Sequence, residues 1–283
     1  MSAAIVKDGS ITRKPGAFEK RIHEVDFVRG FLIALVLMDH LFCWLWQYNE
    51  SWAYRAMSAG HSYAFYEAMG NAFRFYWYST ARQVVRYIAL FGFTFVSGVS
   101  CAFSKNNWIR AAQMIAFAGL LFVGSNILDA FLTEPLQLDS MRIDFNVIAV
   151  LAWSTLFYCF VQSKSWRSIL VMLLVTLLIG WYFIPWLQEA NAGKHLHIYA
   201  PAVLEPYSAQ ADWMPLFPFI SFFLMGALFS YFIYAPTKQS IIKHRGNWER
   251  PLCFLGRHSL IFYLTHQAIL IPLFLLLDLF LGK

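Results

Sequence analysis

The sequence predicts an all-α, polytopic helical membrane protein with about seven transmembrane helices, its N-terminus inside and its C-terminus outside. Of the 283 residues, 59% are hydrophobic and only 13% are charged, and the mean hydropathy is +0.51. Soluble domains carry about 25% charged residues, and a globule of this size has too little interior to hide so many apolar side chains. The aromatic share of 19% also suits a bilayer, because Trp and Tyr gather at its interfaces.

Apolar stretches of bilayer length divide the chain behind a polar N-terminal tail. Spanning the hydrocarbon core takes about 20 mainly apolar residues. We expect a cytoplasmic basic tail over 1–25, retained rather than cleaved as a signal peptide, and a transmembrane domain over 26–283. An aromatic segment at 62–78 carries charges and fits an interfacial or re-entrant helix better than a span. The predicted spans are 27–47, 84–103, 109–132, 145–162, 168–187, 214–235 and 256–281.

Lysine and arginine residues set the predicted orientation, because cytoplasmic loops are enriched in them. An N-terminus inside places thirteen of the 22 basic residues on the cytoplasmic side and seven on the other, with Arg29 and Arg257 at span edges. The basic residues lie in separate short loops, so the net charge of +6 indicates topology rather than binding of nucleic acid. The four cysteines are isolated and lack ligand spacing, so we expect neither a disulfide framework nor a zinc site.

The first span carries ionisable residues at depths where lipid-facing residues would be apolar. Asp26, Arg29 and His40 fall on one stripe of a helix with 3.6 residues per turn. Such residues are costly in a membrane and face the protein interior, which makes each a functional candidate. His40 is either a general base or acyl carrier, or a histidine that bridges helices. Asp26 and Arg29 are either ligand contacts or an anchoring ion pair, and Gly30 leaves room beside them for another backbone or a ligand.

The last span carries a second polar stripe. Ser259, Tyr263 and His266 lie at positions i, i+4 and i+7, with Gln267 beside them and Arg257 at the inner edge. Two histidines in different spans, both facing inward, predict a polar chamber inside the helix bundle.

Three other features have both a structural and a functional interpretation. Small residues form one face of the second span, which suits either close helix packing or substrate contact. Asp212 precedes a proline-rich helix start, where a carboxylate either caps the helix dipole or faces the acceptor at the outer mouth. The pair His195 and His197 in an outer loop is either a weak metal signal or simply solvated. The small residues of the second span are Ser97, Ser100, Cys101 and Ser104.

These segments, in this order, resemble the catalytic domain of heparan-alpha-glucosaminide N-acetyltransferase, within a broader transmembrane acyltransferase superfamily. The resemblance covers about residues 20–275, and its first and last motifs are specific in combination. One departure is Ala149, which ends the run 146–149 where bacterial relatives often carry a histidine. The matching residues are Arg21 with 24–30 leading to His40, 90–92 through 97–98, 212–218, and 255–259 through Tyr263, His266 and Gln267.

The resemblance implies transfer of an acyl group, usually acetyl from acetyl-CoA, to an acceptor across the membrane, with His40 at the position of the family's catalytic histidine. It predicts a multi-pass protein of the bacterial inner membrane. Acetyl-CoA is expected as a co-substrate, with no tightly bound cofactor and no metal. The other expected partners are a glycan or lipid-linked sugar acceptor and membrane lipids, and a homodimer is left open.

The same chemistry sorts the polar residues into roles. Acyl transfer needs a base for the acceptor proton and donors for the oxyanion, and the phosphates of the coenzyme need cations. The predicted site comprises His40 and His266 as catalytic residues, Arg29, Arg257 and Ser259 toward the coenzyme, and Asp26, Asp212, Tyr263 and Gln267 toward the substrate.

Two other function classes fit the same polar chamber. A transporter or channel would move a substrate without chemistry, although the chain shows no inverted repeat of the kind common in transporters. A catalytically silent membrane interaction protein is the third interpretation, and Ala149 keeps it open.

Overall fold

The chain folds into a bundle of helices, here described from a computed structural model for residues 6–7, 10–11, 22–133, 142–162, 165–190, 212–237, 239–242 and 246–281. In the N-terminal tail, strand β1 (Val6–Lys7) pairs antiparallel with β2 (Ser10–Ile11). Every other regular element of the described residues is a helix, so the predicted helical class is confirmed.

In the described part of the chain nine α-helices of seven residues or more follow α1, with short π- or 3₁₀-helical pieces between them. The elements in chain order are α1 (His23–Ser58), α2 (Ala64–Tyr78), α3 (Thr80–Cys101), α4 (Asn107–Leu128), the π-helical η1 (Asp129–Thr133), α6 (Val147–Val161), α7 (Trp166–Leu178), the π-helical η2 (Ile179–Phe183), α8 (Ile184–Ala190), α9 (Phe219–Thr237), the 3₁₀-helical η3 (Asn247–Glu249), α10 (Arg250–Arg257) and α11 (Ser259–Leu281).

Within the ranges that the structure describes, five helices are long and apolar enough to cross a membrane, which makes the chain a multi-pass membrane protein. Two further helices are apolar but shorter, Val147–Val161 and Phe219–Tyr234. The predicted last span begins three residues later than position 256, because the chain turns at His258 and the long helix starts at Ser259. Most of the aromatic segment 62–78 forms the separate helix α2, which begins at Ala64. The five helices are His23–Ser58, Thr80–Cys101, Asn107–Phe131, Trp166–Trp186 and Ser259–Phe280.

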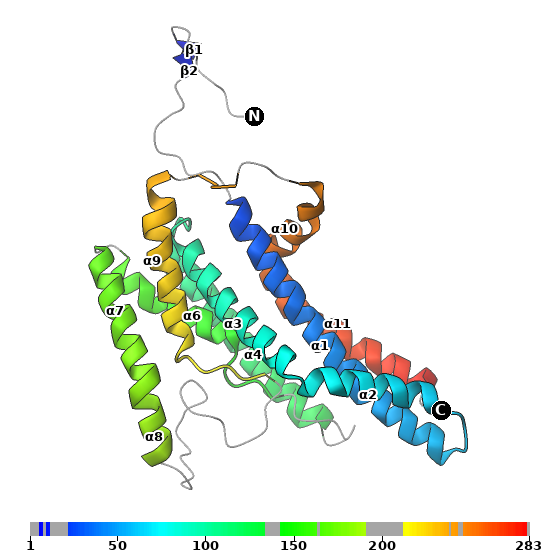
Figure 1. The fold of residues 1–283 in the computed structure, drawn as a ribbon. Coiled ribbons are helices and arrows are strands. Elements are labelled where there is room, and N and C mark those ends of the chain that lie inside the picture. The colour runs from blue at the N-terminus through cyan, green and yellow to red at the C-terminus, as the bar shows by residue number, and fades with distance from the viewer. Residues whose placement is uncertain are drawn as a thin grey trace.

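Helix α1 lies at the centre of one half of the bundle and packs against α2, α3, α10 and α11 (Figure 1). The start of α1, the end of α9 and helix α10 gather at one end of the molecule, and the C-terminal half of α11 lies beside that of α1 at the other (Figure 1). At the first end the Glu24 carboxylate accepts hydrogen bonds from the Tyr234 hydroxyl at 3.1 Å and the Ile241 backbone N–H at 2.7 Å. At the other end Trp52 donates to Asp278 at 2.7 Å, which ties α1 to α11.

A pair of glycines brings α1 and α10 into backbone contact. A Cβ added at Gly30 would lie 1.7 Å from the Leu252 carbonyl oxygen, and one at Gly256 would lie 1.8 Å from the Asp26 carbonyl oxygen. Only glycine fits at such a crossing, as in small-residue helix interfaces of membranes. The space predicted beside Gly30 is therefore filled by another backbone rather than by a ligand.

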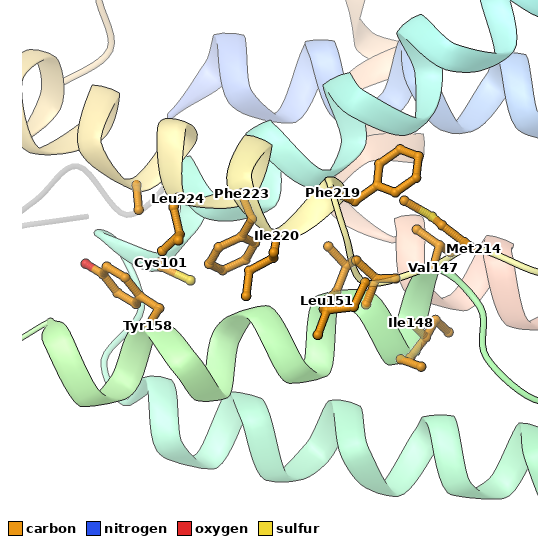
Figure 2. Close-up of a cluster of buried hydrophobic side chains, with 14 of the residues drawn as sticks. Cys101, Val147, Ile148, Leu151, Tyr158, Met214, Phe219, Ile220, Phe223 and Leu224 are labelled. Atoms are coloured by element: carbon orange, nitrogen blue, oxygen red, sulfur yellow. The ribbon is translucent and has the colours of Figure 1, made fainter. Parts of the chain in front are cut away.

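The other half of the bundle is built around α9, which packs against α3, α6 and α7. Gly98 and Gly226 bring α3 and α9 together, since a Cβ on either would lie 1.9 Å from a carbonyl oxygen of the opposite helix. Buried side chains of α6 and α9 interlock beside this crossing (Figure 2), with Phe223, Leu224 and Val150 fully buried. Close packing of this core holds Val147, Ile148 and Leu151 in place. These α6 residues line a cavity together with polar residues of α1 and α11.

Candidate active site

Helices α1 and α11 bring two histidines into direct contact inside the bundle. The ring centres of His40 and His266 are 4.8 Å apart, and the rings meet edge to face at 67°. His266 is buried, with 9% of its surface exposed. The two predicted catalytic residues, 226 positions apart in the sequence, thus form one site.

Hydrogen bonds hold the His40 ring from one side. The Gln267 amide nitrogen lies 2.7 Å from His40 Nδ1, and the Trp44 indole N–H donates to the Gln267 amide oxygen at 3.0 Å. Trp44 stacks on Phe274 of α11 at 5.9 Å between ring centres. Sequence reasoning assigned Gln267 to the substrate, and the structure places it between Trp44 and His40.

The His266 ring is held by its own helix and by Tyr263. His266 Nδ1 lies 2.6 Å from the Tyr263 carbonyl oxygen, while Nε2 is buried without a hydrogen-bond partner among the residues that the structure describes. The Tyr263 ring lies 5.6 Å from the His266 ring, and its hydroxyl donates to the Asp212 carboxylate at 2.6 Å. Asp212 therefore joins the site through Tyr263, from the segment that leads into α9.

Asp39, the sequence neighbour of His40, points into a different cluster, as the helical geometry predicts. Its carboxylate accepts two hydrogen bonds from Arg82 at 2.7 Å each and one from the Tyr76 hydroxyl at 2.9 Å. The Arg82 guanidinium also lies 3.4 Å from the ring centre of Trp77. Burial and the hydrogen bond to Asp39 raise the pKa of Tyr76 to about 12, so this tyrosine stays protonated at neutral pH. The cluster joins α1 to α2 and α3.

A cavity of about 340 Å³ opens between α1, α3, α4, α6 and α11. One part of its wall is cationic and hydroxylated: Arg29 donates to the Ser100 hydroxyl, and Arg110 donates to the Ser97 hydroxyl at 3.0 Å. The remaining polar lining is Ser104, Ser259 and Tyr263, and the apolar lining is Phe93, Phe103, Met114, Val147, Ile148, Leu151 and Leu260.

Tyr263 connects this cavity to the histidine pair. The residue lines the cavity, and its ring contacts His266, which in turn contacts His40. Arg29 and His40 lie about 16 Å apart along α1 at 1.5 Å per residue. The site therefore runs from cations at one end of the bundle to two imidazoles deeper inside it.

The three residues predicted at the inner edge, Asp26, Arg29 and Arg257, have different surroundings in the structure. Asp26 is buried between two arginines, 3.7 Å from Arg29 and 3.3 Å from Arg257. The Asp26–Arg257 pair bridges α1 and α10 beside the Gly30 crossing, whereas the Asp26–Arg29 pair lies within α1. Arg29 also lines the cavity, whereas the Arg257 side chain is 46% exposed at the surface.

Arg110 was missed as a site residue because a basic side chain near a helix start resembles a loop cation. It lies in the first turn of α4 and lines the cavity together with Met114, one turn later. The i, i+4 spacing places Arg110 and Met114 on the same face of a helix, and this was the sequence signal that could have identified Arg110. Ser97, Ser100 and Ser104 line the same cavity, whereas Cys101 is in the apolar core.

Ala149 does not line the cavity that Tyr263 connects to the histidine pair. The preceding Val147 and Ile148 line the large cavity, but Ala149 lines a second cavity of about 220 Å³ between α4 and α6. Asn146 begins this helix by accepting hydrogen bonds from the Ile148 and Ala149 backbone N–H groups.

Across the described residues no group of three or more His, Cys, Asp or Glu side chains is placed to hold a metal ion. The pair His195 and His197, like most of the basic tail, lies outside the described residues.

Comparison with known proteins yields one finding. A family model described as "heparan-alpha-glucosaminide N-acetyltransferase, catalytic" matches residues 51–268. The matched range contains Arg110, Asp212, Tyr263 and His266 but begins after His40. No curated protein and no solved structure matched the chain.

Proposed function

Because the chain belongs to the heparan-alpha-glucosaminide N-acetyltransferase catalytic family, we propose that it transfers an acetyl group from acetyl-CoA to a sugar or another acceptor of the cell envelope. The observation that carries this proposal is the contact of His40 with His266, which Tyr263 links to a cavity lined by two arginines. Imidazoles are suited to proton transfer near neutral pH, and arginines to phosphate binding.

The lining of the cavity suits the chemistry of the donor. Arg29 and Arg110 offer guanidinium groups to the phosphates of the coenzyme, and Ser100 and Ser97 add hydroxyls. The apolar lining then suits the less polar arm that carries the thioester toward Tyr263. Its volume of about 340 Å³ lies in the range of small-molecule sites, which is roughly 300–1,000 Å³. Arg257 would add charge at the rim of the site.

The reaction moves one proton and replaces the C–S bond of the thioester with a bond between the acetyl carbon and the acceptor. The acceptor amine or hydroxyl attacks the thioester carbonyl carbon, the C–S bond breaks, and the acceptor proton passes through an imidazole to the departing thiolate. General acid–base catalysis of this kind contributes about 10²–10⁴-fold to a rate. His40 and His266 are the groups positioned for it.

The proposed topology supplies each substrate from its own side. With seven spans, including α6 and α9, and the N-terminus inside, thirteen basic residues lie on the cytoplasmic side and seven outside. Arg29 and Arg257 then lie at the cytoplasmic end, where acetyl-CoA is available. Asp212 lies toward the outer face, where an envelope acceptor would approach. We propose the bacterial inner membrane as the location, because it has acetyl-CoA on one side and envelope acceptors on the other.

Turnover by the purified protein tests the proposal. The protein in nanodiscs is given acetyl-CoA labelled in its acetyl group, with glucosamine or with a glycan and lipid extract of the source membrane as acceptor. We expect label in the acceptor and free coenzyme A in equal amounts. Uptake of the same sugars into proteoliposomes without transfer of label would instead support a transporter.

A further inference from the structure

We infer that the protein fixes its two imidazoles in opposite tautomers, so that His266 presents a bare Nε2 as general base and His40 presents an Nε2–H to the oxyanion. The inference rests on the proposed acetyl transfer and assigns the roles within it. His40 and His266 are the catalytic residues, and Gln267 and Trp44 are positioning residues that act through His40.

The tautomer of His40 follows from the residue that holds Gln267. An indole N–H only donates, so the Gln267 oxygen must face Trp44, where it accepts at 3.0 Å. The Gln267 NH₂ group therefore faces His40 and donates to Nδ1 at 2.7 Å. A neutral imidazole has one N–H and one acceptor nitrogen. With Nδ1 as the acceptor, the proton of neutral His40 is on Nε2.

The tautomer of His266 follows from a backbone group. The Tyr263 carbonyl only accepts, so His266 Nδ1 must carry the proton that bridges the 2.6 Å between them. In the neutral ring the second nitrogen, Nε2, is then an unprotonated acceptor. It is buried without a partner among the described residues, and a buried polar atom in that state calls for an explanation. A proton donated by the substrate supplies one.

These two tautomers divide the reaction between the rings. The acceptor N–H or O–H gives its proton to His266 Nε2 as its heteroatom bonds to the thioester carbon. The carbonyl oxygen gains negative charge and accepts a hydrogen bond from His40 Nε2–H. The C–S bond then breaks, and the proton on His266 passes to the thiolate, which leaves as free coenzyme A. Rings with centres 4.8 Å apart can reach one substrate group together.

Nitrogen NMR of the intact protein tests the tautomers without turnover. The protein in nanodiscs carries ¹⁵N-labelled histidine, and the variants His40→Gln and His266→Gln identify the two sets of signals. We expect a protonated Nε2 and a bare Nδ1 for His40, and the reverse for His266. The same tautomer in both rings, or a charged His40 at neutral pH, would overturn the inference. Absence of turnover would instead count against the proposed function and leave this measurement intact.

Variants at the positioning residues test how the tautomer is set. Gln267→Glu places an acceptor against Nδ1 and should reverse the His40 tautomer, whereas Gln267→Met should allow a mixture. Trp44→Phe keeps the stacking on Phe274 but frees the Gln267 amide to rotate. The control is Thr265→Val on the same helix, because the Thr265 hydroxyl is exposed and donates to the Ile261 backbone carbonyl one turn earlier. An unchanged His40 tautomer in Gln267→Glu would overturn the inference.

Kinetics test the division of roles. Loss of one oxyanion donor costs about 10²–10³-fold in kcat, and we expect that fall in Gln267→Glu with little change in KM for acetyl-CoA. The acid limb of the pH profile of kcat/KM should disappear in His266→Gln and persist in His40→Gln. The opposite pattern, or a wild-type kcat in a Gln267→Glu protein whose tautomer has reversed, would contradict the assignment.

Discussion

Removal of the Arg110 guanidinium should weaken acetyl-CoA binding more than any other single change at the surface of the cavity. Arg110 lines the cavity and donates to the Ser97 hydroxyl at 3.0 Å, a neutral partner that leaves its charge for an anion. A hydrogen bond to a charged group contributes about 1.5–3 kcal/mol. Since 1.4 kcal/mol is a factor of ten, we expect the Kd of acetyl-CoA to rise about 10–100-fold in Arg110→Met.

Isothermal titration of the protein in nanodiscs measures this change. Methionine keeps an unbranched, flexible stem in place of the arginine and is a good helix former, which limits the disturbance of α4. The control is Arg167→Met, because Arg167 is exposed on α7 and does not line the cavity. Arg257→Met should have a smaller effect than Arg110→Met, because its side chain is 46% exposed and paired with Asp26. Unchanged affinity in folded Arg29→Met and Arg110→Met proteins would refute the assignment of this cavity to the donor.

Three further changes test the fold around the site. A single cysteine at Lys105 in an otherwise cysteine-free protein should be labelled by an impermeant reagent from the cytoplasmic side, and one at His61 from the outside; the reverse pattern would contradict the orientation. Gly30→Ala should destabilise the protein by about 1–3 kcal/mol, because its Cβ would lie 1.7 Å from a backbone oxygen. The control is Gly119→Ala, whose Cβ would meet nothing within 4 Å. Equal thermal stability of the two variants would contradict the backbone contact at Gly30. Asp39→Ala leaves a buried guanidinium without its carboxylate and should cost about 3–5 kcal/mol in chemical denaturation; a loss below about 1 kcal/mol would show that the pair is not structural.

Hydropathy made the helices predictable, because each span must bury its backbone polar groups in its own hydrogen bonds and face lipid with apolar side chains. Polar side chains are costly in lipid, and this cost identified His40 and His266 in the sequence as residues that face the protein interior. The structure places the two rings in contact. The break at His258 was not visible in the sequence. It separates a short helix packed on α1 through Gly256 from the long helix that follows, and only the tertiary contact shows it.

Contacts between distant segments set the rest of the site. Trp44 lies one helical turn after His40, and Gln267 directly follows His266 in the sequence. Their hydrogen bond, however, depends on the relative rotation and shift of α1 and α11. The bond from Tyr263 to Asp212 likewise depends on where the segment before α9 enters the bundle. Helical periodicity gives the face of each residue but not the register between helices.

The rate of acetyl transfer by folded His266→Gln and His40→Gln proteins tests the central claim most directly. Release of coenzyme A is followed with saturating labelled acetyl-CoA and the acceptor that the wild-type protein uses, and donor affinity is measured on the same samples. If the imidazole pair carries the chemistry, each variant should lose about 10²–10⁴-fold in transfer rate while its Kd for acetyl-CoA stays close to the wild-type value. A wild-type rate in either folded variant would contradict the claim that this pair is the reacting centre.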